Sequence, residues 1–144
     1  MPDKETMRRV ERDRRQGKSA STQAGEFVRE EIEHVREGKH GARSAKQAIA
    51  IGLSKARRAG IRLRAPKAGS ASAATRRKAQ QDSASARHPH APSRARSRAT
   101  GRVLKREGHA SGSHAALSRQ ADPLGRKGFP QRSRSLGRID SLCR

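Results

Sequence analysis

Histidine, serine and cysteine are the residues of this chain that could hold a metal ion or act as nucleophiles, and their spacing favours neither role. His88-Pro89-His90 is the only closely spaced His pair, with no carboxylate or thiolate beside it, so we interpret it as adventitious. Cys143 is the only cysteine, which excludes an intramolecular disulfide, and we interpret it as an accidental tail thiol rather than a dimer-forming one. A nucleophile also needs a base held in a water-poor pocket, for which the sequence offers little core. The sequence predicts no enzyme, no metal and no cofactor.

Basic side chains offer a different chemistry, the neutralisation of phosphate. The 35 Lys and Arg outnumber the 13 Asp and Glu, giving a net charge of +22. Residues 1–37 hold nine acidic and nine basic residues, so the excess lies in residues 38–144. In a cell, nucleic acid or anionic lipid would neutralise such a polycation. With 26 Arg, no Trp, no Tyr and two Phe, forked phosphate contacts are favoured over base stacking, which indicates duplex DNA or nucleic acid without discrimination.

The basic residues expected to contact phosphate lie on one helical segment, at its ends and along the basic stretches that follow. A solvated basic face is the alternative, but this face contains no acidic residue and continues into a cationic tail. The predicted nucleic-acid-binding residues are Arg43, Lys46, Lys55, Arg57, Arg58, Arg62, Arg64, Lys67, Arg76, Arg77, Lys78, Arg94, Arg96, Arg98, Arg102, Lys105 and Arg106.

Apolar residues are too few to fold the whole chain. Val, Ile, Leu and Phe number 18 of 144, and nine of them lie between Phe27 and Leu63. A small core is therefore expected there and disorder over much of the rest. The longest apolar run, AIAIGL at 48–53, is too short to span a bilayer, and the N-terminus lacks the apolar region of a signal peptide. We expect no membrane insertion and a cytoplasmic location, at the nucleoid.

Three helices are expected in the N-terminal part. The first covers 4–16 and is marginal, since only Met7 and Val10 are apolar on it. The second begins at a cap at Ser21 or Thr22 and closes at Gly38. The third begins at a Ser44/Gln47 capping box and ends in a Schellman motif at 60–61. The short connection between the last two predicts an antiparallel αα-hairpin, with small residues at 48, 52 and 56 allowing close approach.

The second helix is the only acidic element, and it supplies the alternative function. Glu31 falls inside its apolar stripe, so this side chain either reaches the edge of the packed face or meets a basic side chain of the third helix. The other acids of the helix, Glu26, Glu30, Glu33 and Glu37, are expected to be exposed. A protein partner could bind this acidic helix, residues 22–37.

The chain after residue 64 lacks the apolar periodicity of a folded domain. We predict a helical module at 1–64, a disordered linker at 65–92, a weakly helical basic segment at 93–121 and a disordered tail at 122–144. The segment 102–121 echoes parts of the second and third helices, through duplication or through reuse of an alanine-basic composition. The expected fold class is an all-α small module with a long, mostly disordered basic C-terminal tail.

The segment SAKQAIAIGLSKARRAG at 44–60 resembles the shared helix of a family of small basic bacterial proteins of unknown function. Its members carry a Lys-Gln-Ala-Ile-Ala-Ile-x-Leu-Ser-x-Ala-Arg-x-Ala-Gly run, matched here from Lys46 to Gly60. Residues 21–43 are similar to a longer branch often labelled DNA-binding. The resemblance covers residues 2–64, is looser over 93–121 and is absent after Pro123. It implies a bacterial origin, and with the charge pattern it favours non-sequence-specific DNA binding by a nucleoid-associated or linker-histone-like protein.

Overall fold

The computed structural model describes residues 2–89, 91 and 93–121, and these residues form helices joined by turns and loops. In chain order the elements are α1 (Lys4–Arg15), α2 (Ala20–Arg36), α3 (Ala45–Arg58), α4 (Ala73–Arg87), α5 (Arg94–Arg106), the short 3₁₀ helix η1 (Ala110–Gly112) and α6 (His114–Ala121). The expected all-α class is thus confirmed for the described residues. The tail expected at 122–144 lies outside them.

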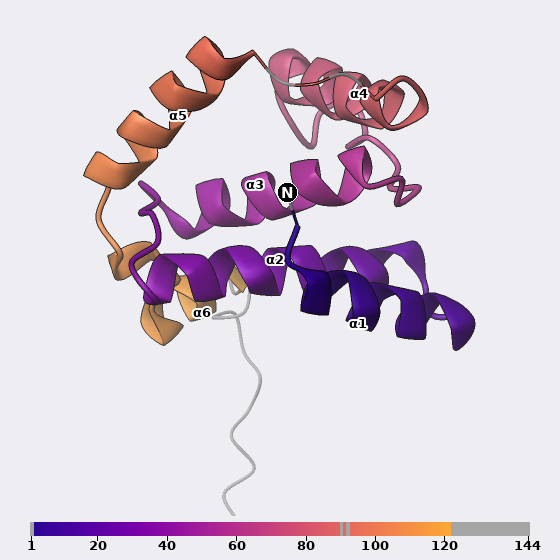
Figure 1. Cartoon of the computed structure of the whole chain (residues 1–144), viewed down its shortest axis with the longest axis horizontal. Coiled ribbons are helices and arrows are strands. Elements are labelled where there is room, and N and C mark those ends of the chain that lie inside the picture. Colours follow the sequence, from indigo (N-terminus) through magenta and orange to yellow (C-terminus); the bar gives the residue numbers. More distant parts are fainter. Residues whose placement is uncertain (1, 90, 92, 122–144) are drawn as a thin grey trace, which may run out of the picture.

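Helices α2 and α3 lie side by side at the centre of the fold, with α1 against α2 and α4 against α3 (Figure 1). Gly52 of α3 lies against Val28 of α2, whereas the earlier Ala48 lies with the later Val35, so the two helices run antiparallel. A Cβ atom added at Gly52 would lie 2.6 Å from the Cα of Val28. Only glycine therefore fits where the two backbones approach most closely.

Local capping signals explain most of the helix ends. The hydroxyl of Ser44 accepts a hydrogen bond from the Gln47 amide at 3.3 Å, as the capping box predicts, while the Gln47 side chain accepts from the Arg43 amide. At the other end of α3, Gly60 has a positive φ of 92° and the Ile61 amide donates to the Ala56 carbonyl, which confirms the Schellman motif.

The start of α2 differs from the prediction of a cap at Ser21 or Thr22. The cap is Ser19, whose hydroxyl accepts from the Thr22 amide at 3.2 Å. The helix therefore begins at Ala20, immediately after this cap and earlier than predicted. Both predicted residues are good capping types, but Ser19 lies nearer the break at Gly17, where φ is positive at 67°. The chain turns there and leaves Ser19 as the first residue able to cap.

Helix α1 is packed more firmly than its two apolar residues suggest. Thr6, Val10 and Asp13 are buried against the rest of the fold, and Arg9 joins α1 to α2 through Glu26, with Nε 2.7 Å from the carboxylate. The expectation of a marginal helix overlooked this face, because Thr6 and Asp13 are polar and do not register in a search for apolar periodicity. Met7 remains 42% exposed.

The core consists of two small apolar clusters along the α2–α3 contact. One contains Val10, Ala24, Phe27 and Ala56, with Leu53, Ile61 and Leu63 packed against it. The other contains Val35, Ala42 and Ala48. Between them, Glu30 and Glu31 of α2 are 2% and 1% exposed. A buried ionic layer therefore separates two modest hydrophobic layers.

Helix α4 contradicts the prediction of a disordered linker across 65–92. Its N-cap is Ser72, whose hydroxyl accepts from the Thr75 amide at 3.1 Å, and the helix buries Ala79 and Asp82 against α3. Asp82 accepts a 2.6 Å hydrogen bond from the Ser54 hydroxyl. The linker prediction failed because one buried acid and one alanine dock this helix, and neither produces an apolar period in the sequence.

Helix α5 packs against no other described helix, and Figure 1 shows it standing apart from the α2–α3 pair. Its C-terminal end is held by backbone hydrogen bonds, from the Gly41 amide to the Leu104 carbonyl and from the Ala42 amide to the Gly108 carbonyl. The chain then returns to α2, where Arg36 Nε donates to the Gly112 carbonyl at 2.7 Å. Residues 93–121, predicted as a weakly helical basic segment, contain α5, η1 and α6.

Candidate nucleic-acid interface and a buried ion cluster

The seventeen predicted phosphate-binding residues do not form one set, because the structure turns some of them inward. Lys55 is the clearest case: its ammonium lies 2.6 Å from a Glu31 oxygen and 3.3 Å from a Glu30 oxygen, and its side chain is 23% exposed. The sequence predicts phosphate contact for Lys55, although it also allows Glu31 to meet a basic side chain of the third helix, and it predicts an exposed Glu30. In this arrangement Lys55 is the internal counterion of α2.

A second group of the predicted residues gathers around Asp82 at the α3–α4 contact. Lys78 lies 2.6 Å and Arg58 3.6 Å from the same Asp82 oxygen, whose side chain is 3% exposed. Arg57 is itself buried at 9% exposure, and its Nε has no hydrogen-bond partner among the described residues. Arg76 of α4 is half-buried and its Nε is likewise unpartnered there. Arg57 and Arg76 are thus part of the helix contact, whereas Arg58 and Lys78, with side chains 52% and 62% exposed, pair with Asp82 from the surface.

The remaining predicted residues stay on the surface. Arg43 is 80% exposed, although it lies 3.6 Å from Glu107. The others make no ion pair with any described residue, and the structure leaves them exposed: Lys46, Arg62, Arg64, Lys67, Arg77, Arg94, Arg96, Arg98, Arg102, Lys105 and Arg106. We call these eleven residues the exposed cationic set. Six of them lie on α5. Three more, Arg62, Arg64 and Lys67, lie in the connection between α3 and α4, and Arg77 lies on α4.

Acidic side chains are fully engaged in the part of the chain that the structure describes. Every Asp and Glu there lies within 4.0 Å of a basic side chain, Asp3 with His34 and the others with at least one Lys, Arg or His. The exposed cationic set therefore has no acidic partner left within that part of the fold. Its charge must be balanced from outside.

Helix α5 carries the densest group of the exposed cationic set. All of its residues except Gly101 and Leu104 are exposed, and its 13 residues extend about 20 Å at 1.5 Å per residue. Arg94, Arg98, Arg102 and Lys105 follow one another at four- and three-residue steps, so they share a face. This face is the strongest candidate for contact with a phosphate backbone.

The ionic layer inside the fold is a second candidate site. His40, in the connection after α2, places Nε2 2.8 Å from Glu31 Oε1, and its Nδ1 donates to the Gly41 carbonyl at 3.1 Å. His34 Nε2 lies 3.0 Å from Asp3 Oδ2. The hydrogen bond with His34 is the main cause that lowers the pKa of Asp3 below its ordinary value; partial desolvation opposes it, and the nearby charges of His34, Lys39 and Lys55 add to the lowering.

Sequence reasoning missed this cluster, although part of its pattern is visible. Of the two alternatives for Glu31, the structure shows the pairing with a basic residue of α3, Lys55. The expectation that Glu30 is exposed was wrong, because Glu30 also faces Lys55 and accepts from the Asp3 amide at 3.3 Å. His34 follows Glu31 by three residues and Glu30 by four, so the sequence already placed these three side chains on one face of the helix. His40 and Asp3 join only through the fold.

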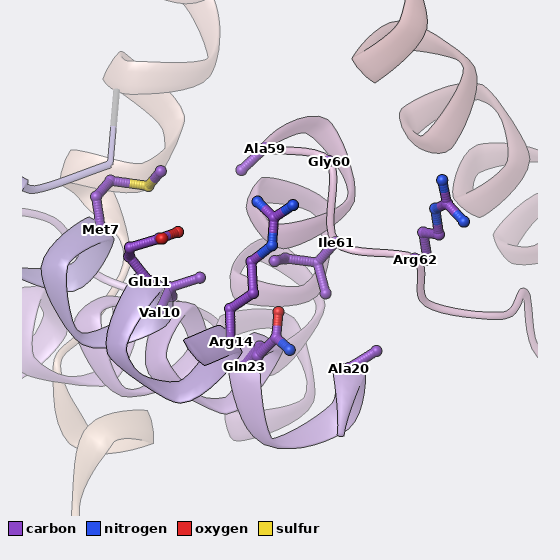
Figure 2. Close-up of a pocket in the computed structure, with 10 residues that line it drawn as sticks. All are labelled: Met7, Val10, Glu11, Arg14, Ala20, Gln23, Ala59, Gly60, Ile61 and Arg62. Atoms are coloured by element: carbon purple, nitrogen blue, oxygen red, sulfur yellow. The ribbon is translucent and has the colours of Figure 1, made fainter. Parts of the chain in front are cut away.

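A surface pocket between α1 and the end of α3 lacks catalytic chemistry (Figure 2). Met7, Val10 and Ile61 provide apolar lining, and Arg14 and Arg62 add positive charge. Its one carboxylate, Glu11, lies 3.1 Å from Arg15, and the lining contains no Ser, Thr, Cys or His. No nucleophile and base meet in this pocket.

No protein-family model, curated protein or solved structure matches this chain. Among the described helices, none is both long and apolar enough to cross a membrane.

Proposed function

We propose that this protein binds duplex DNA without sequence specificity, as a nucleoid-associated or linker-histone-like protein of the bacterial cytoplasm. The observation that carries the proposal is that the described acids are all engaged while the exposed cationic set is not. Phosphates are the abundant cellular anions that could neutralise this set, and releasing their counterions would drive binding. The α2–α3 hairpin would act as the scaffold, and the basic chain after it would supply most of the contacts.

Arginine chemistry and the scarcity of aromatic residues support duplex DNA over single strands. Five of the six basic residues of α5 are Arg, which can contact phosphate through a planar fork. With no Trp or Tyr in the chain, stacking of unpaired bases has almost no platform. The sequence contains no motif typical of base readout, so the proposal is for backbone contact and not for sequence readout. It describes a binding protein and assigns no catalysis.

The proposed family of small basic bacterial proteins fits this function without supplying a mechanism. Its run from Lys46 to Gly60 coincides with α3, the helix whose small residues allow close approach to α2. In this proposal the family run serves mainly to build the hairpin, since Lys55 and Arg57 face inward within it, while Arg58 pairs with Asp82 from an exposed position.

The alternative, a protein partner for the acidic helix, has less support. Glu30 and Glu31 are buried, and Glu26 pairs with Arg9. Glu33 is partly exposed and Glu37, the residue that follows α2, is exposed, and each lies near a cation of its own, Arg29 or Lys39. Little free negative charge is left on α2 to attract a basic partner.

The test is a fluorescence-anisotropy titration of a labelled duplex at several salt concentrations. If the protein neutralises about six to ten phosphates, affinity should fall by about 10³ to 10⁵ between about 50 and 200 mM salt. A single-stranded DNA and an RNA of the same length should bind more weakly. A flat salt response would refute the electrostatic mechanism, and protein purified at low salt without nucleic acid would favour the alternative.

A charge-matched pair of variants locates the interface. The first changes Arg94, Arg98, Arg102 and Lys105 of α5 to Gln, and the control changes four exposed residues of α1, Lys4, Arg8, Arg12 and Arg14, to Gln. Both lose the same charge from a surface helix. The α5 variant should flatten the slope of log affinity against log salt by about 3 to 4, at about 0.9 per phosphate contact, and the α1 variant by much less. Equal effects would show that net charge alone matters.

A further inference from the structure

We propose that Glu31, His34 and His40 bind one divalent transition-metal ion, and that Zn²⁺ is the ion this donor set fits best. One ligand atom from each of the three residues can be chosen so that all lie within 4.8 Å of one another. Tetrahedral zinc with bonds of about 2.0 to 2.1 Å holds its ligands roughly 3.3 Å apart, so small side-chain rotations suffice. Two imidazoles and one carboxylate are a common zinc-binding set that leaves a fourth position open.

The hydrogen bonds of His40 support a cation at this point. Its Nδ1 donates to the Gly41 carbonyl, which is the outer contact that orients many metal-binding imidazoles. In the neutral ring this leaves a lone pair on Nε2, and Nε2 lies only 2.8 Å from Glu31 Oε1. A lone pair and a carboxylate repel each other at this distance unless a positive charge lies between them. A metal ion provides that charge, as does a proton.

The excess negative charge of the surrounding cluster also favours the binding of a cation. Glu30 and Glu31 are buried and Asp3 lies at the mouth of the cluster, so three carboxylates surround the site. Lys55 is the only Lys or Arg that pairs with any of them among the described residues. With neutral imidazoles, the buried Glu30 and Glu31 carry one negative charge more than Lys55 balances, which is costly at a buried site, and the half-exposed Asp3 adds a second negative charge at the mouth of the cluster. One divalent ion would supply the two positive charges that balance this excess.

Access to the site is open on the side of the two histidines. The side chains of His34 and His40 are 13% and 17% exposed, whereas Glu31 is 1% exposed. The two rings meet edge to face with centroids 6.0 Å apart. An ion could therefore enter past the rings and reach the buried carboxylate without opening the α2–α3 contact.

The experiment uses the untagged full-length chain, freed of metal with a chelator and free of nucleic acid. Zn²⁺ is titrated in competition with a chromophoric chelator, and the thermal midpoint is measured with and without Zn²⁺. The same measurements are made on His40→Asn and His34→Asn. The control is His109→Asn combined with His114→Asn, which removes two exposed imidazoles elsewhere. Circular dichroism of each metal-free variant checks that it is folded.

The proposal expects about one Zn²⁺ per chain, with affinity lowered at least about tenfold in each of the two site variants and unchanged in the control. The thermal midpoint should rise with Zn²⁺ in the wild type and the control, and not in the site variants. If one site variant fails to fold, the zinc affinity of the other still tests the proposal. No binding at micromolar Zn²⁺, or equal binding by the folded site variants, would overturn the proposal and leave protons as the balancing charge. The readout involves no DNA, so it is independent of the proposed function.

Discussion

Replacing Gly52 by Ala should push the two central helices apart. The added Cβ would lie 2.6 Å from Val28 Cα, 2.9 Å from Val28 N and 3.0 Å from the Phe27 carbonyl oxygen. These are backbone atoms, so no side-chain rotation can relieve the contact, and α3 must shift by about 1 Å to restore ordinary van der Waals separation. Overpacking of this kind costs about 1 to 3 kcal/mol. The better helix propensity of Ala returns about 0.8 to 1 kcal/mol, which leaves a net loss of about 0 to 2 kcal/mol.

Gly25→Ala is the matched control for this prediction. Gly25 also lies inside a helix, α2, but nothing approaches its Cβ position within 4 Å. This substitution should therefore stabilise the protein by up to about 1 kcal/mol through propensity alone. The assay is urea unfolding followed by far-ultraviolet circular dichroism, with the three proteins fitted to a shared m-value. A Gly52→Ala protein as stable as Gly25→Ala would refute the close α2–α3 approach.

Three further predictions concern docking, pH and capping. Asp82→Ala should cost about 1 to 3 kcal/mol locally and raise amide exchange in α4 while α2 stays protected, since a buried hydrogen-bonded carboxylate is lost. The pKa of Asp3, measured by NMR, should lie below the ordinary value of about 3.9 and return towards it in His34→Phe. The contact between Asp3 and His34 therefore stabilises the fold above about pH 4, and this stabilisation is lost as the pH falls through the lowered pKa. Ser19→Ala should destabilise α2 by about 1 kcal/mol, and Ser21→Ala by much less, in the same urea assay.

Sequence patterns located the central helices well because their signals are local. The Ser44/Gln47 cap and the Gly60–Ile61 ending depend on residues within one turn of each other, and both are present in the structure. The small residue at 52 also lies where close approach requires it. The start of α2 was misplaced by two or three residues because several Ser and Thr compete there and the turn at Gly17 decides among them.

Helix α4 was missed for a physical reason. Its docking depends on Ala79 and on Asp82, which bonds to Ser54 about one turn before the end of α3. A single buried carboxylate surrounded by Lys78, Arg58 and a hydroxyl can hold a helix that lacks an apolar stripe. Composition correctly indicated a poor hydrophobic core, but it does not detect polar docking.

The sequence by itself determined the class of fold and the excess of positive charge after residue 37, because helix periods, caps and composition are local or additive properties. Only the tertiary structure decided which charges are balanced inside. Lys55 meets Glu31 across 24 residues and His34 meets Asp3 across 31, and these pairs form because antiparallel packing brings distant turns together. Coulomb attraction acts through space and not along the chain, so the division between internal ion pairs and the exposed cationic set follows from the fold.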